Sequence, residues 1–169
     1  MALIPILKFP NPRLRSISNP VTVFDQKLKT FAADMLETMI DANGAGLAAP
    51  QVGHLKRIII VTSSTDRENY GEDTLTLVNP KVINSEGIIF SEEGCLSVID
   101  LNAKVRRFNA VTVRAQDLDG AFLEVEASGR LAIVLQHEID HLNGILFIDY
   151  LNKETKEAYL RHLQKIKSA

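Results

Sequence analysis

Residues 128–144 restrict the fold of this chain more than any other segment. They read SGRLAIVLQHEIDHLNG, and residues 131–135 are apolar on nearly every side of a helix. A helix that is apolar all round belongs in the middle of a fold, because a surface helix shows a single apolar stripe. We therefore predict a buried central helix, with Ser128 as its N-cap and its end near Asn143 and Gly144.

Two further helices are expected, one on each side of this segment. Asp25 is an expected N-cap, and apolar residues at helical spacing follow it until Asn43 and Gly44. A C-terminal amphipathic helix is expected over residues 153 to about 167. Its predicted inner face consists of Tyr159, Leu160, Leu163 and Ile166.

Segments rich in Ile and Val, separated by Gly, Asn and Asp, predict strands between the first two helices. The predicted strands are 57–62, 75–84, 87–92, 105–107, 110–116 and 122–127. Strands grouped together, rather than alternating with helices, favour an α+β fold with mixed or antiparallel sheets. We expect one domain over residues 1–169, in which these sheets pack around the central helix.

Composition narrows the class of protein. The formal net charge is −2, so the whole chain has no general attraction for DNA or for anionic lipid. The longest apolar runs are too short to cross a membrane, and the N-terminus lacks the pattern of an export signal. Cys95 is the single cysteine, which fits a reducing compartment, and a cytoplasmic location is therefore expected.

The string HEIDH predicts a metal site. His137 and His141 stand four residues apart, so on a helix both rings project from one face and can share a cation. Glu138 stands next to the first ring. It can take a proton from metal-bound water and later deliver it to a leaving nitrogen. The alternative is a helix with one core histidine and one surface histidine.

A catalytic centre of this kind usually has a third protein ligand and one open position. One protease group continues as HExxHxxGxxH, but here the match ends at Gly144, because Phe147 replaces the third histidine. Glu154 or Glu157 could supply a carboxylate from the following helix. The remaining candidate is Cys95, in the glycine-flanked bend EEGCLS after a strand. Cys95 could also be a buried apolar side chain or a nucleophile paired with a histidine.

A third string, GAGLAAPQ at residues 44–51, has two interpretations. It is either a helix end with a tight turn, or a place where small residues let backbone approach a substrate and Gln51 donates a hydrogen bond. In this order, GAGLAAPQ, EEGCLS and QHEIDHLNG make the chain resemble the peptide deformylase family. The resemblance implies removal of the formyl group from the N-terminal methionine of nascent polypeptides, with release of formate.

The resemblance also implies a cofactor and roles for individual residues. The implied metal is ferrous iron, and zinc, nickel or cobalt could occupy the same site. The implied ligands are Cys95, His137 and His141, and the implied catalytic glutamate is Glu138. The implied oxyanion contacts are the side chain of Gln51 and the backbone N–H of Leu96. The implied peptide site comprises Gly44, Ala45, Gly46, Ile133, Val134 and His137.

Two positions depart from the family pattern. Ile99 and Asn102 stand where many members have a proline and an arginine near the substrate path. The resemblance therefore does not predict the peptide contacts beyond the first residue. Arg106 or Arg107 could compensate, or one of them pairs with Glu92 or Glu93, which is the interpretation we favour.

The last helix carries an excess of positive charge, with Lys153, Lys156, Arg161, Lys165 and Lys167 against Glu154 and Glu157. The resemblance suggests that it contacts ribosomal RNA. A solvated face with cations near a helix C-terminus is an equally good interpretation.

Three other functions are compatible with these motifs. They are a zinc endopeptidase with a downstream glutamate, a cysteine hydrolase, and a deformylase-like fold retained as a binding module. Glu138 argues against the last, because a purely structural metal site does not need it.

Overall fold

The computed structural model describes residues 2–70 and 72–168. Its helices and strands are, in chain order, α1 (Gln26–Asp41), β1 (Gly46–Ala48), β2 (Ile58–Thr62), β3 (Thr74–Glu86), β4 (Ile89–Cys95), β5 (Val98–Arg107), β6 (Ala110–Gln116), β7 (Phe122–Ser128), α2 (Arg130–Leu142) and α3 (Lys153–Ser168). The paired strands are antiparallel and form one sheet of order β1-β2-β3-β6-β7 and a separate β4-β5 hairpin. The predicted α+β fold is confirmed.

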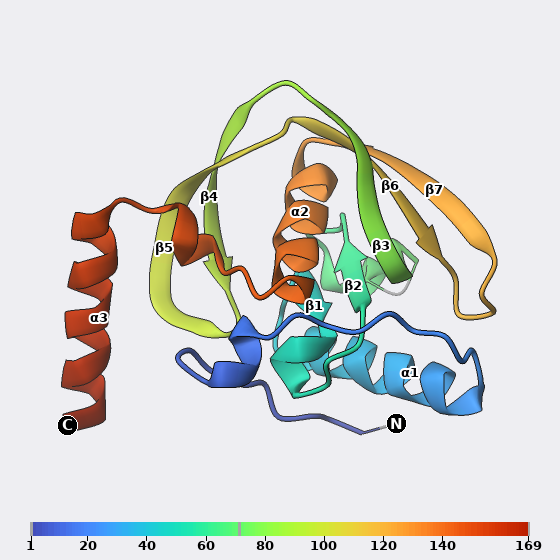
Figure 1. The fold of residues 1–169 in the computed structure, drawn as a ribbon, viewed down its shortest axis with the longest axis horizontal. Helices are drawn as coiled ribbons and strands as arrows, with labels where there is room; N and C mark the ends of the chain where they lie inside the picture. Colours follow the sequence, from blue (N-terminus) through green and yellow to red (C-terminus); the bar gives the residue numbers. More distant parts are fainter. Residues whose placement is uncertain (1, 71, 169) are drawn as a thin grey trace.

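The helix α2 lies in the middle of the molecule, between the β4-β5 hairpin and the larger sheet (Figure 1). The strand β2 shows why. Its side chains alternate between two faces, and Ile59 and Val61 pack in the cluster that contains α2. Ile58 and Ile60 pack in a second cluster with α1. All five residues of β2 are buried, as expected for a strand covered on both faces.

The first helix agrees with its prediction. The side chain of Asp25 accepts a hydrogen bond from the backbone N–H of Leu28 at 3.0 Å, which satisfies one of the free donors at the helix start. Met35 and Met39 are fully buried against the sheet. The helix ends at Asp41, just before the predicted stop.

The start of α2 differs from its prediction. Ser128 is not an N-cap, because it is the last residue of β7 and pairs with Ala110 of β6. The N-cap is Gly129, which has a φ of 62° and no side chain to cap the helix. The strand therefore extends one residue closer to the helix than the sequence pattern indicated, and a glycine makes the abrupt change of direction.

The β4-β5 hairpin is longer than predicted. The strand β5 begins at Val98 rather than at residue 105, and Cys95 is the last residue of β4 rather than part of a bend after it. The expected bend is the tight turn formed by Leu96 and Ser97.

The last helix, α3, packs beside this hairpin at the edge of the molecule (Figure 1). Tyr159 and Leu163 are buried there, and the hydroxyl of Tyr159 donates to the backbone carbonyl of Ile99 at 2.7 Å. The prediction was wrong for Leu160 and Ile166, which are 47% and 38% exposed, because α3 contacts the protein along a narrow stripe. Among the described helices, none is long and apolar enough to cross a membrane.

Candidate active site

The structure brings the three predicted metal ligands together. The helix α2 presents His137 and His141 on one face, and β4 ends with Cys95 beside them. The Sγ atom of Cys95 lies 3.3 Å from Nε2 of His141. One ligand atom from each of the three residues lies within 4.8 Å of the others. Two imidazole nitrogens and one sulfur could hold zinc, iron, nickel or cobalt.

A carboxylate fixes the orientation of the first histidine. Nδ1 of His137 lies 3.0 Å from Oε1 of Glu93, on the neighbouring strand β4. This contact leaves Nε2 of His137 for a metal, which is the usual arrangement of a ligand histidine and a supporting carboxylate. Burial would raise the pKa of Glu93, but hydrogen bonds from Arg107 and His137 outweigh burial and lower it.

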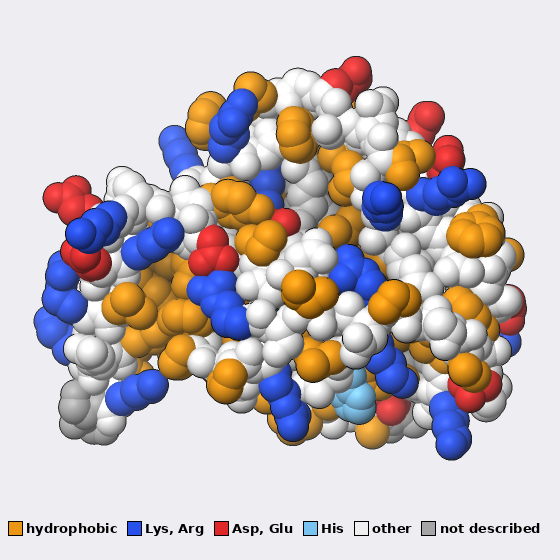
Figure 2. Space-filling model, viewed as in Figure 1, with side chains coloured by type: hydrophobic (Ala, Val, Ile, Leu, Met, Phe, Trp, Pro, Cys, Tyr) orange, Lys and Arg blue, Asp and Glu red, His pale blue; other side chains and the backbone are white. Residues whose placement is uncertain are grey.

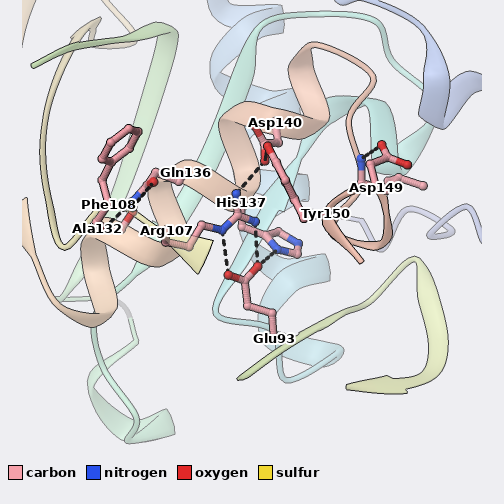
Figure 3. A network of polar contacts seen from close by, with 10 residues as sticks. Glu93, Arg107, Phe108, Ala132, Gln136, His137, Asp140, Asp149 and Tyr150 are labelled. Carbon is pink, nitrogen blue, oxygen red and sulfur yellow. Dashed lines mark hydrogen bonds and ion pairs between the residues drawn. The ribbon is translucent and has the colours of Figure 1, made fainter. Parts of the chain in front are cut away.

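The same carboxylate belongs to a buried ionic network (Figure 3). Arg107 donates two hydrogen bonds to Glu93, both of 2.7 Å, and a third of 2.7 Å to Oδ2 of Asp140. The hydroxyl of Tyr150 also donates to that oxygen at 2.7 Å, and its ring lies under the guanidinium of Arg107. The predicted salt bridge from this pair of arginines is confirmed for Arg107 and Glu93. The network joins β4, β5, α2 and the short turn Phe147–Tyr150 behind His137.

Glu138 lies at the site with an unused acceptor atom. It is 4% exposed, and its Oε2 atom has no hydrogen-bond partner among the described residues. Burial is the main cause that raises the pKa of Glu138 to about 7. Buried polar atoms without a partner are rare in folded proteins and often mark functional positions. Glu138 is therefore placed to exchange a proton with a bound molecule.

The glycine at residue 46 makes room for this glutamate. A Cβ atom at Gly46 would stand 2.6 Å from Oε1 and 2.7 Å from Cγ of Glu138. No side chain therefore fits on this face of β1, whose backbone is fixed by pairing with β2. The resemblance implied that Gly46 contacts the peptide, but it did not predict this contact with Glu138.

Gln51 is held so that its amide nitrogen points toward the metal ligands. Its Oε1 accepts a hydrogen bond from the backbone N–H of Ala48 at 2.9 Å. Its Nε2 donates to Oγ of Ser97 at 3.1 Å and makes a long hydrogen bond of 3.7 Å to Sγ of Cys95. These contacts use both amide hydrogens, so Gln51 would donate to a bound molecule in place of the long, weak bond to sulfur.

A pocket of about 680 Å³ opens onto this cluster. All of the predicted substrate-binding residues line it: Gly44, Ala45, Gly46, Ile133, Val134 and His137. Gln51, Cys95, Leu96 and Glu138 line it as well, whereas His141 is 1% exposed and lies behind them. Ile89, Ser91, Glu92 and Arg130 also line this wall and were not predicted. The period of two along β4 and of three or four along α2 would have identified all of them except Glu92.

The remaining candidates lie outside the pocket. Ile99 packs in the cluster beneath α3, and Asn102 is exposed, with its side chain against the Cα atom of Gly94. Glu154 and Glu157 are exposed on α3 and are not members of the ligand group formed by the described residues. The endopeptidase alternative, which needs one of them as a ligand, loses its support.

Comparison with known proteins decides the family. Residues 3–157 match the family model for polypeptide deformylase. The chain belongs to the polypeptide deformylase family. It is 43% identical over 169 residues to a peptide deformylase from Acidobacterium capsulatum, covering 100% of this chain and 98% of the relative. The suspected family is therefore confirmed, and membership of it makes the chain a hydrolase.

Two solved structures of this family extend the comparison. A peptide deformylase from Legionella pneumophila has a TM-score of 0.91 and 42% identity, covering 99% of this chain and 96% of that chain. A class I type b peptide deformylase from Acinetobacter baumannii, solved with Met-Ala-Ser bound, has a TM-score of 0.83 and 36% identity, covering 89% of this chain and 99% of that chain. The fold of the family thus extends over nearly all of the chain.

Proposed function

We propose that this hydrolase removes the formyl group from the N-terminal methionine of nascent polypeptides and releases formate, with one divalent metal at its centre. The observation that carries the proposal is the convergence of Cys95, His137 and His141 beside the unpartnered carboxylate of Glu138. The Acinetobacter relative supports the substrate, because Met-Ala-Ser begins with the methionine that deformylation would leave.

Cys95, His137 and His141 would hold the metal, and the donor set fits ferrous iron, which we propose as the physiological ion, as well as zinc, nickel and cobalt. When bound, such an ion supplies a Lewis acid that polarises the formyl group and makes water more acidic. The contact from Glu93 would keep Nε2 of His137 directed at it.

Glu138 would carry the proton between the two halves of the reaction. Its carboxylate accepts a proton from the attacking water, whose oxygen forms a bond to the formyl carbon. It then delivers that proton to the peptide nitrogen as the carbon–nitrogen bond breaks. The products are formate and a peptide with a free amino terminus. Because Glu138 is buried, bulk water does not compete for this proton.

Gln51 and Leu96 would stabilise the negative charge that develops on the formyl oxygen. Gln51 is held in place by Ala48 and Ser97, so only its long bond to Sγ of Cys95 would have to give way for its amide to donate. Leu96 lies in the turn directly after Cys95, and its backbone N–H is the second proposed donor. Donors fixed in advance lower the barrier more than donors that must move.

The peptide would lie extended beside Gly44, Ala45 and Gly46, where small residues allow close approach of two backbones. The methionine side chain would contact Ile133, Val134 and the ring of His137. An apolar pocket of this kind discriminates only modestly between hydrophobic side chains. We therefore expect other long apolar residues to be accepted at a cost.

The test is an anaerobic assay of formate release from formyl-Met-Ala, combined with elemental analysis of the purified protein. The proposal predicts formate release that stops when the metal is chelated and returns when ferrous iron is added. Acetyl-Met-Ala serves as the control substrate. A chain that binds the peptide without releasing formate would be a binding module. Loss of activity on thiol alkylation, with no effect of chelation, would instead identify a cysteine hydrolase.

The proposed location is the cytoplasm, and the ribosome is a further proposed partner through α3. Exposed Lys and Arg side chains follow the outer edge of this helix (Figure 2). Phosphate contacts of this kind weaken as salt rises. The test is co-sedimentation with ribosomes at low and high salt. Co-sedimentation that is sensitive to salt and is lost when Arg161 and Lys165 are changed to Gln would support the contact. Co-sedimentation unaffected by these changes would exclude it.

A further inference from the structure

The proposed chemistry does not use Arg130, a charged residue of the pocket. Arg130 is exposed and lines the pocket at the first position of α2. Residues 130, 133, 134 and 137 share one face of the helix, because they are spaced by three or four positions. Arg130 therefore stands at the outer end of the stripe formed by Ile133, Val134 and His137. The rise of an α-helix puts it about 10 Å along the axis from His137.

The position of Arg130 is unfavourable for the helix itself. The N-terminal end of a helix carries partial positive charge, so a cation there is disfavoured and an acidic residue is preferred. The first turn of α2 contains no acidic residue, and its N-cap, Gly129, offers no side chain. A residue that breaks a local rule without a visible structural gain is often explained by function.

Arg130 also has no partner within the protein. None of the ion pairs and side-chain hydrogen bonds formed by the described residues involves it. Neither acidic residue of β4 that lines the same pocket pairs with it. Glu93 is bound to Arg107 and His137. Glu92 lies opposite Lys104 on the hairpin and forms none of the ion pairs found among the described residues.

The chemistry of an extended peptide indicates what Arg130 would meet. Successive side chains of a strand point to opposite sides, so the first and third lie on the same side, about 7 Å apart. If the first side chain contacts Ile133 and Val134, as proposed above, the third extends along the same wall. The guanidinium stands at the end of that wall, where it attracts a carboxylate and repels an ammonium group. Glu92 also lines the pocket, but it stands on β4 and not on this wall of α2.

We propose that Arg130 is a specificity-determining residue that favours formylated peptides with an acidic third residue over those with a basic one. The inference rests on the proposed function, since it takes the first residue to be a formylated methionine in this pocket. It adds a preference that depends on charge at a position beyond the first residue. Arg130 acts on peptide selection and takes no part in bond cleavage.

The test uses amidated peptides formyl-Met-Ala-X-Ser, with X as Glu, Gln or Lys, and the iron-loaded enzyme. We expect kcat/KM to be about three- to tenfold higher for Glu than for Lys at low salt, with Gln between them. The difference should shrink at high salt, because exposed charges are screened. Arg130→Gln should abolish the preference and Arg130→Glu should reverse it. The matched control is Arg106→Gln, an exposed arginine that lines a different pocket and should keep the preference.

A second measurement separates this inference from the proposed function. Binding of amidated Met-Ala-Glu and Met-Ala-Lys to the metal-loaded protein can be measured by calorimetry without turnover. Met-Ala-Glu should bind more tightly than Met-Ala-Lys, and the difference should disappear in Arg130→Gln. Absence of formate release from every peptide would refute the proposed function. The role of Arg130 would be refuted if formate release and peptide binding did not depend on X. It would also be refuted if the dependence on X survived in Arg130→Gln. Thermal unfolding of Arg130→Gln should show no loss of stability, since the helix start gains by losing a cation.

Discussion

The two ends of α2 are built in different ways. At the C-terminal end, His137, Glu138 and His141 are each at most 8% exposed, and a buried network holds the first of them in place. At the N-terminal end, Gly129 provides no cap and Arg130 is exposed without a partner. Under the proposed function, the rigid half would carry out the chemistry and the less constrained half would help to select the peptide. Substitutions at Glu138, Gly46, Glu93 and Tyr150 test how far the C-terminal half depends on that rigidity.

Replacement of Glu138 by Gln should have the largest effect on turnover. The amide keeps the size of the side chain but cannot accept the proton from water, so kcat should fall by about 10² to 10⁴. The metal content should remain, because Glu138 is not a member of the ligand group. Glu157→Gln, on the exposed surface of α3, is the control and should retain full kcat. A Glu138→Gln protein with normal turnover would show that another group moves the proton.

Gly46→Ala should lower kcat by displacing the side chain of Glu138. The new methyl group would stand 2.6 Å from Oε1 of Glu138, and β1 cannot easily move because it pairs with β2. A displacement of about 1 Å at a catalytic group can reduce the rate by roughly 10². Steady-state kinetics should show a lower kcat with unchanged metal content. Unchanged kcat would mean that the backbone adapts and that the C-terminal half of α2 is less rigid than described.

Glu93→Gln tests the network behind the metal ligands. Loss of the carboxylate would leave the buried guanidinium of Arg107 with one ionic partner, Asp140, and weaken the support of His137. Unfolding by urea should show a loss of stability on the order of 3 kcal/mol, and metal affinity should fall about 10- to 100-fold. Asp119→Asn breaks an exposed pair with Lys29 and should change neither quantity measurably. Equal effects of the two variants would contradict the importance of burial.

Tyr150→Phe should have the smallest effect. It removes one hydrogen bond to Asp140 and keeps the ring that lies under Arg107. Because Asp140 retains its bond from Arg107, the expected loss of stability is about 1 kcal/mol. Chemical unfolding of this variant beside Glu93→Gln would show whether the contribution of the network to stability rises from Tyr150 towards His137. A loss as large as that of Glu93→Gln would contradict this gradient.

The parts of the site on α2 could be predicted because they depend on local spacing. The helical repeat alone puts His137, Glu138 and His141 beside one another, and the apolar residues before them predict burial. The strand β1 could not be predicted in this way. Its residues Gly46–Ala48 are too few and too small to show a strand pattern, and they form a strand only because β2 pairs with them.

The error at the hairpin was avoidable, whereas the error at the start of α2 reflects a contact distant in sequence. In residues 98–104 the apolar residues alternate with Asp100, Asn102 and Lys104, which is the period of two of a half-buried strand, and pairing with β4 makes the segment a strand. Ser128 has the composition of an N-cap, yet its pairing with Ala110 keeps it in the sheet. The approach of Cys95 to His141 likewise comes from the folding of β4 against α2, which local spacing does not reveal.

The most direct test of the account is the absorption spectrum of the protein loaded anaerobically with Co²⁺. If Cys95, His137 and His141 bind one cation, the wild-type chain should bind one equivalent and show a thiolate-to-cobalt charge-transfer band. Cys95→Ser should lose that band and most of its affinity for the metal. A Cys95→Ser protein that binds cobalt as tightly as the wild type, with the same spectrum, would contradict a shared site.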